Sequence, residues 1–217
     1  MSDSDTLRLA FGGKIAIVTG AASGLGMGFA QQIDRAGGTV IAADINLEGV
    51  QQVVARLGQP PGAHQLDVRD SAAVVKLVDD TVDKHGRIDY IFNNAGIAVQ
   101  GYVEEIPIED WDAIIDINLK GVAYGTAAAY RHMVRQGNGH IVNTASLAGL
   151  TPAPLLAPYS TVKFGVVGMC DSLRVEAQAA IENLLREQGG EISPLGMPRV
   201  RSDNGSCYVS REFRGVL

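Results

Sequence analysis

The sequence predicts an α/β fold in which a doubly wound parallel sheet is covered by helices on both faces, giving three αβα layers. Short apolar runs rich in β-branched residues alternate with segments whose apolar residues recur at helical spacing. A glycine-rich turn joins the first apolar run to the first helical segment. The chain has 217 residues, a length that suits one α/β domain. We therefore expect residues 1–217 to form a single domain.

The first half of the chain contains three predicted strands. Residues 1–12 are expected to be peripheral, and KIAIVTG (14–20) is the first strand. A helix follows, with Leu25, Phe29 and Ile33 four residues apart. The next two strands are expected in TVIAAD and HQLDV, each followed by a helix, and either Asp70 or Ser71 can cap the second of these helices.

The second half continues the alternation. IDYIFNNAG (88–96) is the fourth predicted strand, a long helical region covers Pro107 to Gln136, and HIVNTAS (140–146) is the fifth strand. The last helix is expected to begin near Tyr159 and to pass beyond Glu176.

The C-terminal segment, residues 178–217, does not continue this pattern. AAIENLLREQGG is typical of continued helix, SPLGMPRVRSDNGS is typical of a loop, and only SCYVS suggests a short strand. The predicted core is therefore 12–177, and a sixth strand is uncertain.

Composition narrows the class of function. Apolar residues make up 46% and charged residues 19%, as in globular proteins, and the net charge of −6 argues against nucleic acid or an anionic membrane as partner. Because Cys170 and Cys207 are isolated and neither a leader nor a transmembrane run is apparent, we expect a cytoplasmic protein. The four histidines show no ligand spacing, so no metal is expected.

Two motifs indicate a dinucleotide site. In TGAASGLG, Gly20, Gly24 and Gly26 lie between a strand and a helix, where the backbone can approach a pyrophosphate, although glycines also serve ordinary turns. Asp44 ends the second strand and can accept hydrogen bonds from both adenosine ribose hydroxyls, which favours NAD over NADP. The alternative is that Asp44 only caps the next helix.

A third motif indicates acid/base chemistry. Tyr159 and Lys163 are four residues apart in YSTVK, so both side chains share one helical face. A lysine cation one turn away would stabilise tyrosinate and make Tyr159 a candidate general acid/base.

Together these residues resemble the short-chain dehydrogenase/reductase family, with its Rossmann fold. The resemblance rests on TGAASGLG, Asp67-Val68, NNAG at 93–96, Asn118, Ser146 and YSTVK, in the family's order and spacing. It implies hydride transfer between a nicotinamide and a secondary alcohol or ketone, without a metal. It also implies a homodimer or homotetramer formed through the YSTVK helix and the helix around Asn118.

The resemblance implies four catalytic residues. Tyr159 exchanges the hydroxyl proton, Lys163 stabilises the tyrosinate and holds the nicotinamide ribose, and Ser146 bonds the substrate oxygen. Asn118 holds a relay water and stabilises a local break in its helix. Asp67 would meet the adenine amino group, Asn93 would tie the fourth strand to the cofactor site, and Gly96 would leave room for the ribose. The full set of expected NAD-binding residues is Gly20, Ser23, Gly24, Leu25, Gly26, Asp44, Asp67, Val68, Asn94, Ala95, Gly96, Tyr159 and Lys163.

The sequence also leaves alternatives open. The segment LAGLTPAPLLAP between Ser146 and Tyr159 predicts an apolar substrate, or else contact with a neighbouring subunit or the chain's own tail. The family's usual sixth strand and Pro-Gly turn have no counterpart after the YSTVK helix, which favours, as a second hypothesis, a catalytically impaired nucleotide-binding or regulatory protein. A nucleotide-sugar epimerase or dehydratase would use the same tyrosine and lysine, but its glycine turn normally reads TGxxGxxG.

Overall fold

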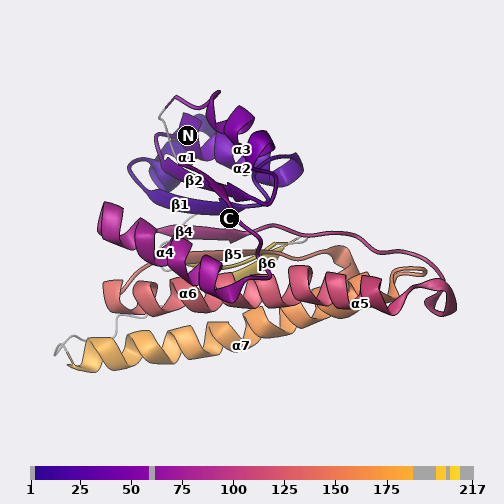
Figure 1. Ribbon diagram of the computed structural model, residues 1–217. Helices are drawn as coiled ribbons and strands as arrows, with labels where there is room; N and C mark the ends of the chain where they lie inside the picture. Colours follow the sequence, from indigo (N-terminus) through magenta and orange to yellow (C-terminus); the bar gives the residue numbers. More distant parts are fainter. Residues whose placement is uncertain (1–2, 59–61, 188–198, 204–205, 211–217) are drawn as a thin grey trace.

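One seven-stranded sheet forms the centre of the molecule (Figure 1). The structure is a computed structural model that describes residues 3–58, 62–187, 199–203 and 206–210. The strands are β1 (Ile15–Thr19), β2 (Thr39–Asp44), β3 (Ala63–Gln65), β4 (Tyr90–Asn93), β5 (His140–Thr144), β6 (Arg199–Asp203) and β7 (Ser206–Ser210). Their order is β3-β2-β1-β4-β5-β7-β6. The pairings among the first five strands are all parallel, which confirms the predicted doubly wound arrangement.

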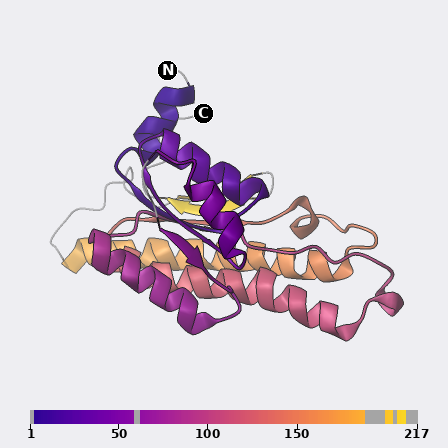
Figure 2. The ribbon, with the colours of Figure 1, turned by 45° about the horizontal axis from the view of Figure 1, so that its top comes forward.

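Helices cover both faces of this sheet (Figures 1 and 2). On one face lie α1 (Asp3–Phe11), α2 (Gly24–Arg35) and α3 (Leu47–Val54). On the other lie α4 (Ser71–His85), α6 (Gly121–Gln136) and α7 (Ala157–Glu187), and α5 (Ile108–Ile115) leads into α6. Short turns of 3-10 helix occur at Val103–Glu105 and Leu147–Gly149. No helix in the described part of the chain is both long and apolar enough to cross a bilayer.

The two layers of helices explain why β1 carries apolar residues on both of its faces. Along β1, Ile15 and Ile17 belong to the core under α4, α6 and α7, whereas Ala16 and Val18 belong to the core under α2 and α3. Successive side chains of a strand point to opposite faces, so a strand covered on both sides is apolar on both of them.

Residues 3–11, within the segment expected to be peripheral, form helix α1, whose described side chains are exposed or partly buried. The Phe11 ring lies 4.9 Å from the Tyr90 ring, measured between centroids, and the Tyr90 hydroxyl donates a hydrogen bond to the Ala10 carbonyl at 3.0 Å. These contacts hold α1 against β4.

The predicted helices are observed with clear ends. Asp70, rather than Ser71, caps α4, because its side chain accepts hydrogen bonds from the backbone of Ala72 and Ala73. The long helical region consists of α5, a π-helical turn at Asp116–Lys120, and α6. The third strand is shorter than predicted and includes neither Asp67 nor Val68.

The C-terminal segment corrects one prediction. The expected continuation of the last helix is observed to Glu187, and SCYVS forms β7. Residues 199–203, however, form strand β6 where a loop was expected. RVRSD lacks the apolar run that identifies a buried strand, and an edge strand does not require one. Strand β7 pairs antiparallel with β5, so the sixth position of the sheet is filled in the opposite direction to the first five. The predicted loop at 193–198 and the tail at 211–217 lie outside the described residues.

A buried polar cluster joins β4, β5 and α6. The Asn93 amide donates hydrogen bonds to the side chains of Asn143 at 2.8 Å and Thr126 at 3.2 Å. Helix α6 approaches this cluster at Gly125, where an added Cβ would lie only 1.9 Å from the Asn93 side-chain oxygen. A side chain at this position cannot be accommodated without moving the helix or breaking the cluster.

We therefore expect Gly125→Ala to destabilise the protein by about 1–3 kcal/mol, measured by urea denaturation followed by circular dichroism. Gly28→Ala on α2 is the matched control, because an added Cβ there meets nothing within 4 Å. Alanine favours helix over glycine, so the control should gain roughly 0.5–1 kcal/mol. Equal stability of Gly125→Ala and the parent would contradict the tight packing of α6 on Asn93.

Candidate active site

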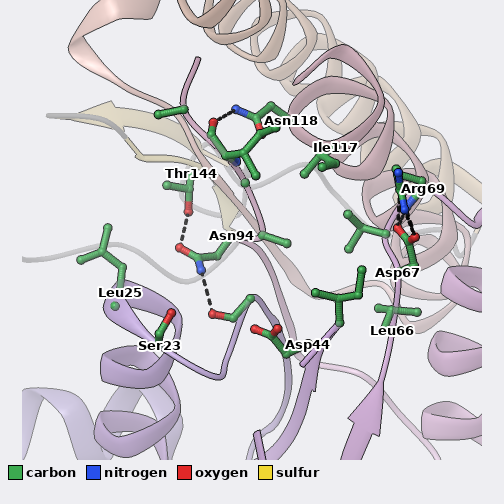
Figure 3. Close-up of a pocket in the computed structure, with 18 of the residues that line it drawn as sticks. Ser23, Leu25, Asp44, Leu66, Asp67, Arg69, Asn94, Ile117, Asn118 and Thr144 are labelled. Carbon is green, nitrogen blue, oxygen red and sulfur yellow. Dashed lines mark hydrogen bonds and ion pairs between the residues drawn. The ribbon is translucent and has the colours of Figure 1, made fainter. Parts of the chain in front are cut away.

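A cleft of about 600 Å³ opens at the carboxyl ends of the parallel strands (Figure 3). In doubly wound sheets this edge is where ligands bind. Most of the sequence-predicted site residues line the cleft, namely Gly20, Ser23, Gly24, Leu25, Asp44, Asp67, Val68, Asn94, Ala95, Gly96, Asn118, Tyr159 and Lys163. The structure therefore brings these residues, which are distant in the sequence, to one cleft.

The glycine-rich turn forms one wall of this cleft. Gly20 has a φ of +67°, a conformation that glycine adopts without strain. Gly26 does not line the cleft, although it was predicted with the cofactor residues. An added Cβ at Gly26 would lie 2.1 Å from the Gly20 carbonyl oxygen, so this glycine lets α2 pack against the turn. Its contribution to the site is close packing.

Asp44 faces the same turn from the end of β2. One carboxylate oxygen accepts a hydrogen bond from the Ala22 backbone at 3.0 Å, and the other accepts from the Asn46 backbone at 2.9 Å. The cap of α3 is Asn46, whose side chain accepts from the Gly49 backbone. Asp44 therefore does not act as the helix cap that was its alternative interpretation.

Asp67 forms an ion pair that the sequence prediction did not include. The Arg69 guanidinium contacts both carboxylate oxygens, with its closest nitrogen at 2.6 Å (Figure 3). Hydrogen bonding from Arg69 lowers the pKa of Asp67 below its usual value. Because both side chains are partly exposed, this pair contributes more to the orientation of the carboxylate than to stability.

Asn94, rather than Asn93, connects the fourth strand to the cleft. Its side-chain amide donates hydrogen bonds to the carbonyl oxygens of Thr19 at 3.1 Å and Gly20 at 3.5 Å. Asn93 points to the face of the sheet that α6 covers, where it bonds Asn143 and Thr126. Adjacent residues of a strand point to opposite faces, and this explains why only one of the two asparagines reaches the site.

Asn118 lies in the π-helical turn between α5 and α6, where a local break was expected. Its side chain accepts a hydrogen bond from the Ile97 backbone at 2.8 Å and donates one to the Ile97 carbonyl at 2.7 Å. The amide thus ties the turn to the segment after β4. An added Cβ at Gly96 would lie 3.1 Å from the Asn118 side-chain oxygen, so Gly96 permits this contact.

Tyr159 and Lys163 occupy the first turns of α7, beside the end of β5. The Lys163 ammonium lies 5.5 Å from the centre of the Tyr159 ring and donates a hydrogen bond to the Thr144 carbonyl at 2.6 Å. The Lys163 side chain is buried, and this burial lowers the pKa of its ammonium to about 8.

Ser146 is the one predicted catalytic residue that does not line the cleft. Its hydroxyl oxygen accepts a hydrogen bond from the Ala148 backbone at 3.2 Å, and the residue caps the short 3-10 turn at Leu147–Gly149. The structure therefore brings Asn118, Tyr159 and Lys163 to the cleft and gives Ser146 a local bond at its rim.

Several lining residues escaped sequence prediction, namely Ile45, Leu66, Arg69, Ile97, Ala98, Ile117 and Thr144. Most of them directly follow or precede a predicted site residue, so proximity in sequence was the available signal. Arg69 and Thr144 carry polar groups as well. Arg69 bonds Asp67, two residues away, and Thr144 bonds Asn94, 50 residues away.

Comparison with known proteins identifies the class to which this nucleotide-binding α/β fold belongs. The short chain dehydrogenase family model matches residues 14–183. D-threitol dehydrogenase of Mycolicibacterium smegmatis is 40% identical over 167 residues, covering 76% of this chain and 64% of that protein. The 3-oxoacyl-(acyl-carrier-protein) reductase FabG of Thermotoga maritima is 39% identical over 160 residues, covering 72% and 65%.

Solved structures give the same result. A short-chain dehydrogenase/reductase from Burkholderia phymatum in complex with NAD matches with a TM-score of 0.74 and 33% identity, over 85% of this chain and 64% of that one. Carveol dehydrogenase from Mycobacterium avium in complex with NAD matches with a TM-score of 0.73 and 32% identity, over 79% and 68%. The chain belongs to the short-chain dehydrogenase/reductase family. It matches less than two thirds of the length of the two curated relatives named above.

Burial of Lys163 has a consequence for stability. Because the pKa of its ammonium in the folded protein, about 8, lies below the usual value of 10.5, the unfolded chain binds more protons than the folded one between these pH values. The free energy of unfolding should therefore rise as the pH rises from 8 to 10.5. In Lys163→Met this contribution is lost.

Urea denaturation of the parent and of Lys163→Met at pH 7, 8, 9 and 10 checks this expectation. The stability of the parent relative to the variant should increase above pH 8. Lys76→Met, which removes an exposed lysine from α4, controls for the general effect of losing a cation. A difference between parent and Lys163→Met that stays constant over this range would contradict a buried, readily deprotonated ammonium.

Proposed function

We propose that the protein is an NAD-dependent oxidoreductase that transfers a hydride between nicotinamide and a secondary alcohol or ketone, with Tyr159 as general acid/base. The observation that carries this proposal is that one cleft collects the glycine turn, Asp44 and the Tyr159–Lys163 pair. These groups belong to separate elements that are distant in the sequence. Membership of the family supports the same reaction class.

The cleft fits a dinucleotide by the chemistry of its lining. The turn containing Gly20 and Gly24 brings backbone, without side chains, to the N-terminus of α2, which suits a pyrophosphate. Carboxylates at Asp44 and Asp67 suit the ribose hydroxyls and the adenine amino group. Lys163 would hold the nicotinamide ribose. The bound nicotinamide supplies or accepts the hydride.

The protein's own part in the reaction is proton transfer and orientation. The Tyr159 hydroxyl takes the proton from the alcohol or returns it to the alkoxide. The Lys163 ammonium, close to the Tyr159 ring, favours negative charge on the tyrosine oxygen. Asn118 holds the segment after β4 through its two hydrogen bonds with Ile97. It would also hold a water that relays protons between Lys163 and the solvent. Ser146 would donate its hydroxyl hydrogen to the substrate oxygen while its own oxygen accepts the bond from the Ala148 backbone.

Replacing Tyr159 tests the catalytic proposal. Tyr159→Phe should abolish NADH formation from a panel of secondary alcohols, because the ring remains and the proton-transferring oxygen is lost. NAD binding, measured by calorimetry, should persist. Tyr130→Phe removes a partly buried hydroxyl on α6, outside the lining of the cleft, and should keep its turnover. Parent-like turnover in Tyr159→Phe would exclude the tyrosine mechanism.

The preference for NAD follows from the charge at Asp44. A carboxylate at the end of β2 can bond ribose hydroxyls and repels a 2′-phosphate. The NAD complexes of the Burkholderia phymatum and Mycobacterium avium proteins support this cofactor. Arg69 also lines the cleft, but its guanidinium is paired with Asp67.

Asp44→Asn should lower the ratio of NAD affinity to NADP affinity by roughly tenfold or more, since the repulsion of a phosphate by a carboxylate is worth at least about 1.4 kcal/mol. Calorimetric titration with each cofactor measures the ratio. Asp80→Asn, on α4 and paired with Lys76, is the control for loss of one negative charge. An unchanged ratio in Asp44→Asn would assign cofactor preference to another residue.

The substrate is proposed to be apolar. Leu147, Leu150 and Leu155, in the segment between Ser146 and Tyr159, are 68%, 48% and 49% exposed. A substrate that reaches Tyr159 past this segment would contact these leucines. The alternative remains that the segment contacts a neighbouring subunit or the chain's own tail.

A second candidate function is nucleotide binding without turnover. It is favoured by the antiparallel β7, which occupies the place next to β5 where the family's usual sixth strand would run in parallel. Loss of that strand and its Pro-Gly turn would remove contacts that orient the nicotinamide. NAD binding without NADH formation from any alcohol in the panel would favour this candidate.

Assembly and location are also proposals. A homodimer or homotetramer through α7 and the α5–α6 region is supported by exposed apolar residues on α7, where Phe164 is 46% and Val175 is 67% exposed. We further propose one domain over residues 1–217, located in the cytoplasm, with no nucleic acid or membrane partner.

A further inference from the structure

Thr144, the last residue of β5, makes two contacts that involve different parts of the cleft. Its hydroxyl donates a hydrogen bond to the Asn94 side-chain oxygen at 3.1 Å (Figure 3). Its backbone carbonyl accepts the hydrogen bond from the Lys163 ammonium at 2.6 Å. One residue therefore contacts both the cofactor-binding segment after β4 and the lysine of the YSTVK helix.

The Thr144 hydroxyl stabilises the orientation of the Asn94 amide that the carbonyl oxygens of Thr19 and Gly20 require. With its oxygen toward Thr144, the amide directs its nitrogen to the carbonyl oxygens of Thr19 and Gly20. The Thr19 hydroxyl oxygen in turn accepts hydrogen bonds from the backbone of Asn94 and Ala95 at 3.0 and 3.1 Å. If the amide turned over, its oxygen would face two carbonyl oxygens, an arrangement without a donor. The Thr144 hydroxyl thus favours the orientation that holds the glycine turn.

The same strand end fixes Lys163. Lys163 is only 5% exposed, so its ammonium needs a hydrogen-bond acceptor within the protein. The Thr144 carbonyl supplies that acceptor, and its position depends on the end of β5. The Lys163 ammonium thus lies beside the same strand end that the Thr144 hydroxyl bonds to Asn94.

We propose that Thr144 is a positioning residue whose hydroxyl holds the Asn94 amide, and through it the turn at Gly20, in the arrangement that binds the cofactor. The inference rests on the proposed function, and it concerns a residue that none of the sequence motifs includes. It assigns to the hydroxyl an effect on cofactor affinity, exerted through Asn94 and Gly20. The chemical step itself, carried by Tyr159, does not involve this hydroxyl.

Thr144→Val tests the proposal, since valine keeps the branched shape and suits a strand. Loss of a hydrogen bond of ordinary strength should weaken NAD binding roughly three- to tenfold, measured by calorimetry. In steady-state kinetics the KM for NAD should rise while kcat changes less than twofold. Thr144→Ser restores the hydroxyl and should restore the affinity to within about twofold of the parent.

Thr81→Val is the matched control. Thr81 is buried in α4, where its hydroxyl donates to the Leu77 carbonyl at 2.7 Å. Its replacement should leave NAD affinity unchanged, whatever its effect on urea stability. A purely structural role for Thr144 would lower stability without the specific rise in KM, and serine would not need to restore binding. That pattern would overturn the proposal.

A double-mutant cycle tests whether the Thr144 hydroxyl affects NAD affinity through Asn94 or independently of it. In an Asn94→Ala background, Thr144→Val should cost less than twofold in NAD affinity, because the hydroxyl has lost its partner. A cost equal to that in the parent background would overturn the proposal. Different results would contradict the proposed function. These are that the parent protein binds neither NAD nor NADP, or that Tyr159→Phe keeps its turnover.

Discussion

The parallel pairing of β1 with β4 and of β4 with β5 is the constraint on which the site depends. Ile17 pairs with Ile91, and Ile91 pairs with Ile141, so the three strands lie in register. Strands in parallel register end together at one edge of the sheet. The residues that follow those ends, from Gly20 to Thr144, are brought to a common cleft although they lie far apart in the chain.

Hydrogen bonds at the strand ends add to the backbone pairing of the sheet in fixing the rim of the cleft. Hydrogen bonds between Thr19, Asn94 and Thr144 connect β1, β4 and β5 at the rim of the cleft. Beneath them, the buried amides of Asn93 and Asn143 connect β4 to β5 and to α6. A buried polar group is costly unless it is paired, so such networks favour one arrangement of the strands over its alternatives.

The C-terminal segment shows where prediction from sequence was weakest. Strands β1, β2 and β4 are buried along most of their length and carry short apolar runs, which identify them without a structure. β6 lies at the edge of the sheet and its residues, RVRSD, are mostly polar, so nothing in their local pattern separates a strand from a loop. The direction of β7, antiparallel to β5, is likewise a property of the pairing and not of the segment SCYVS.

Local chemistry in the sequence determined the alternation of strands and helices, the glycine turn, and the pairing of Tyr159 with Lys163 on one helix face. Each of these depends on residues within a few positions of one another, where spacing alone specifies geometry. Only the tertiary structure decided that Asn94 reaches the cleft while Asn93 is buried in the sheet, that Ser146 bonds locally, and that Arg69 pairs with Asp67. It also decided the contacts of Thr144, whose partners Asn94 and Lys163 are 50 and 19 residues away. Contacts of this kind depend on how separate elements pack and on which face of a strand each side chain occupies. The local spacing of residues in the sequence specifies neither of these.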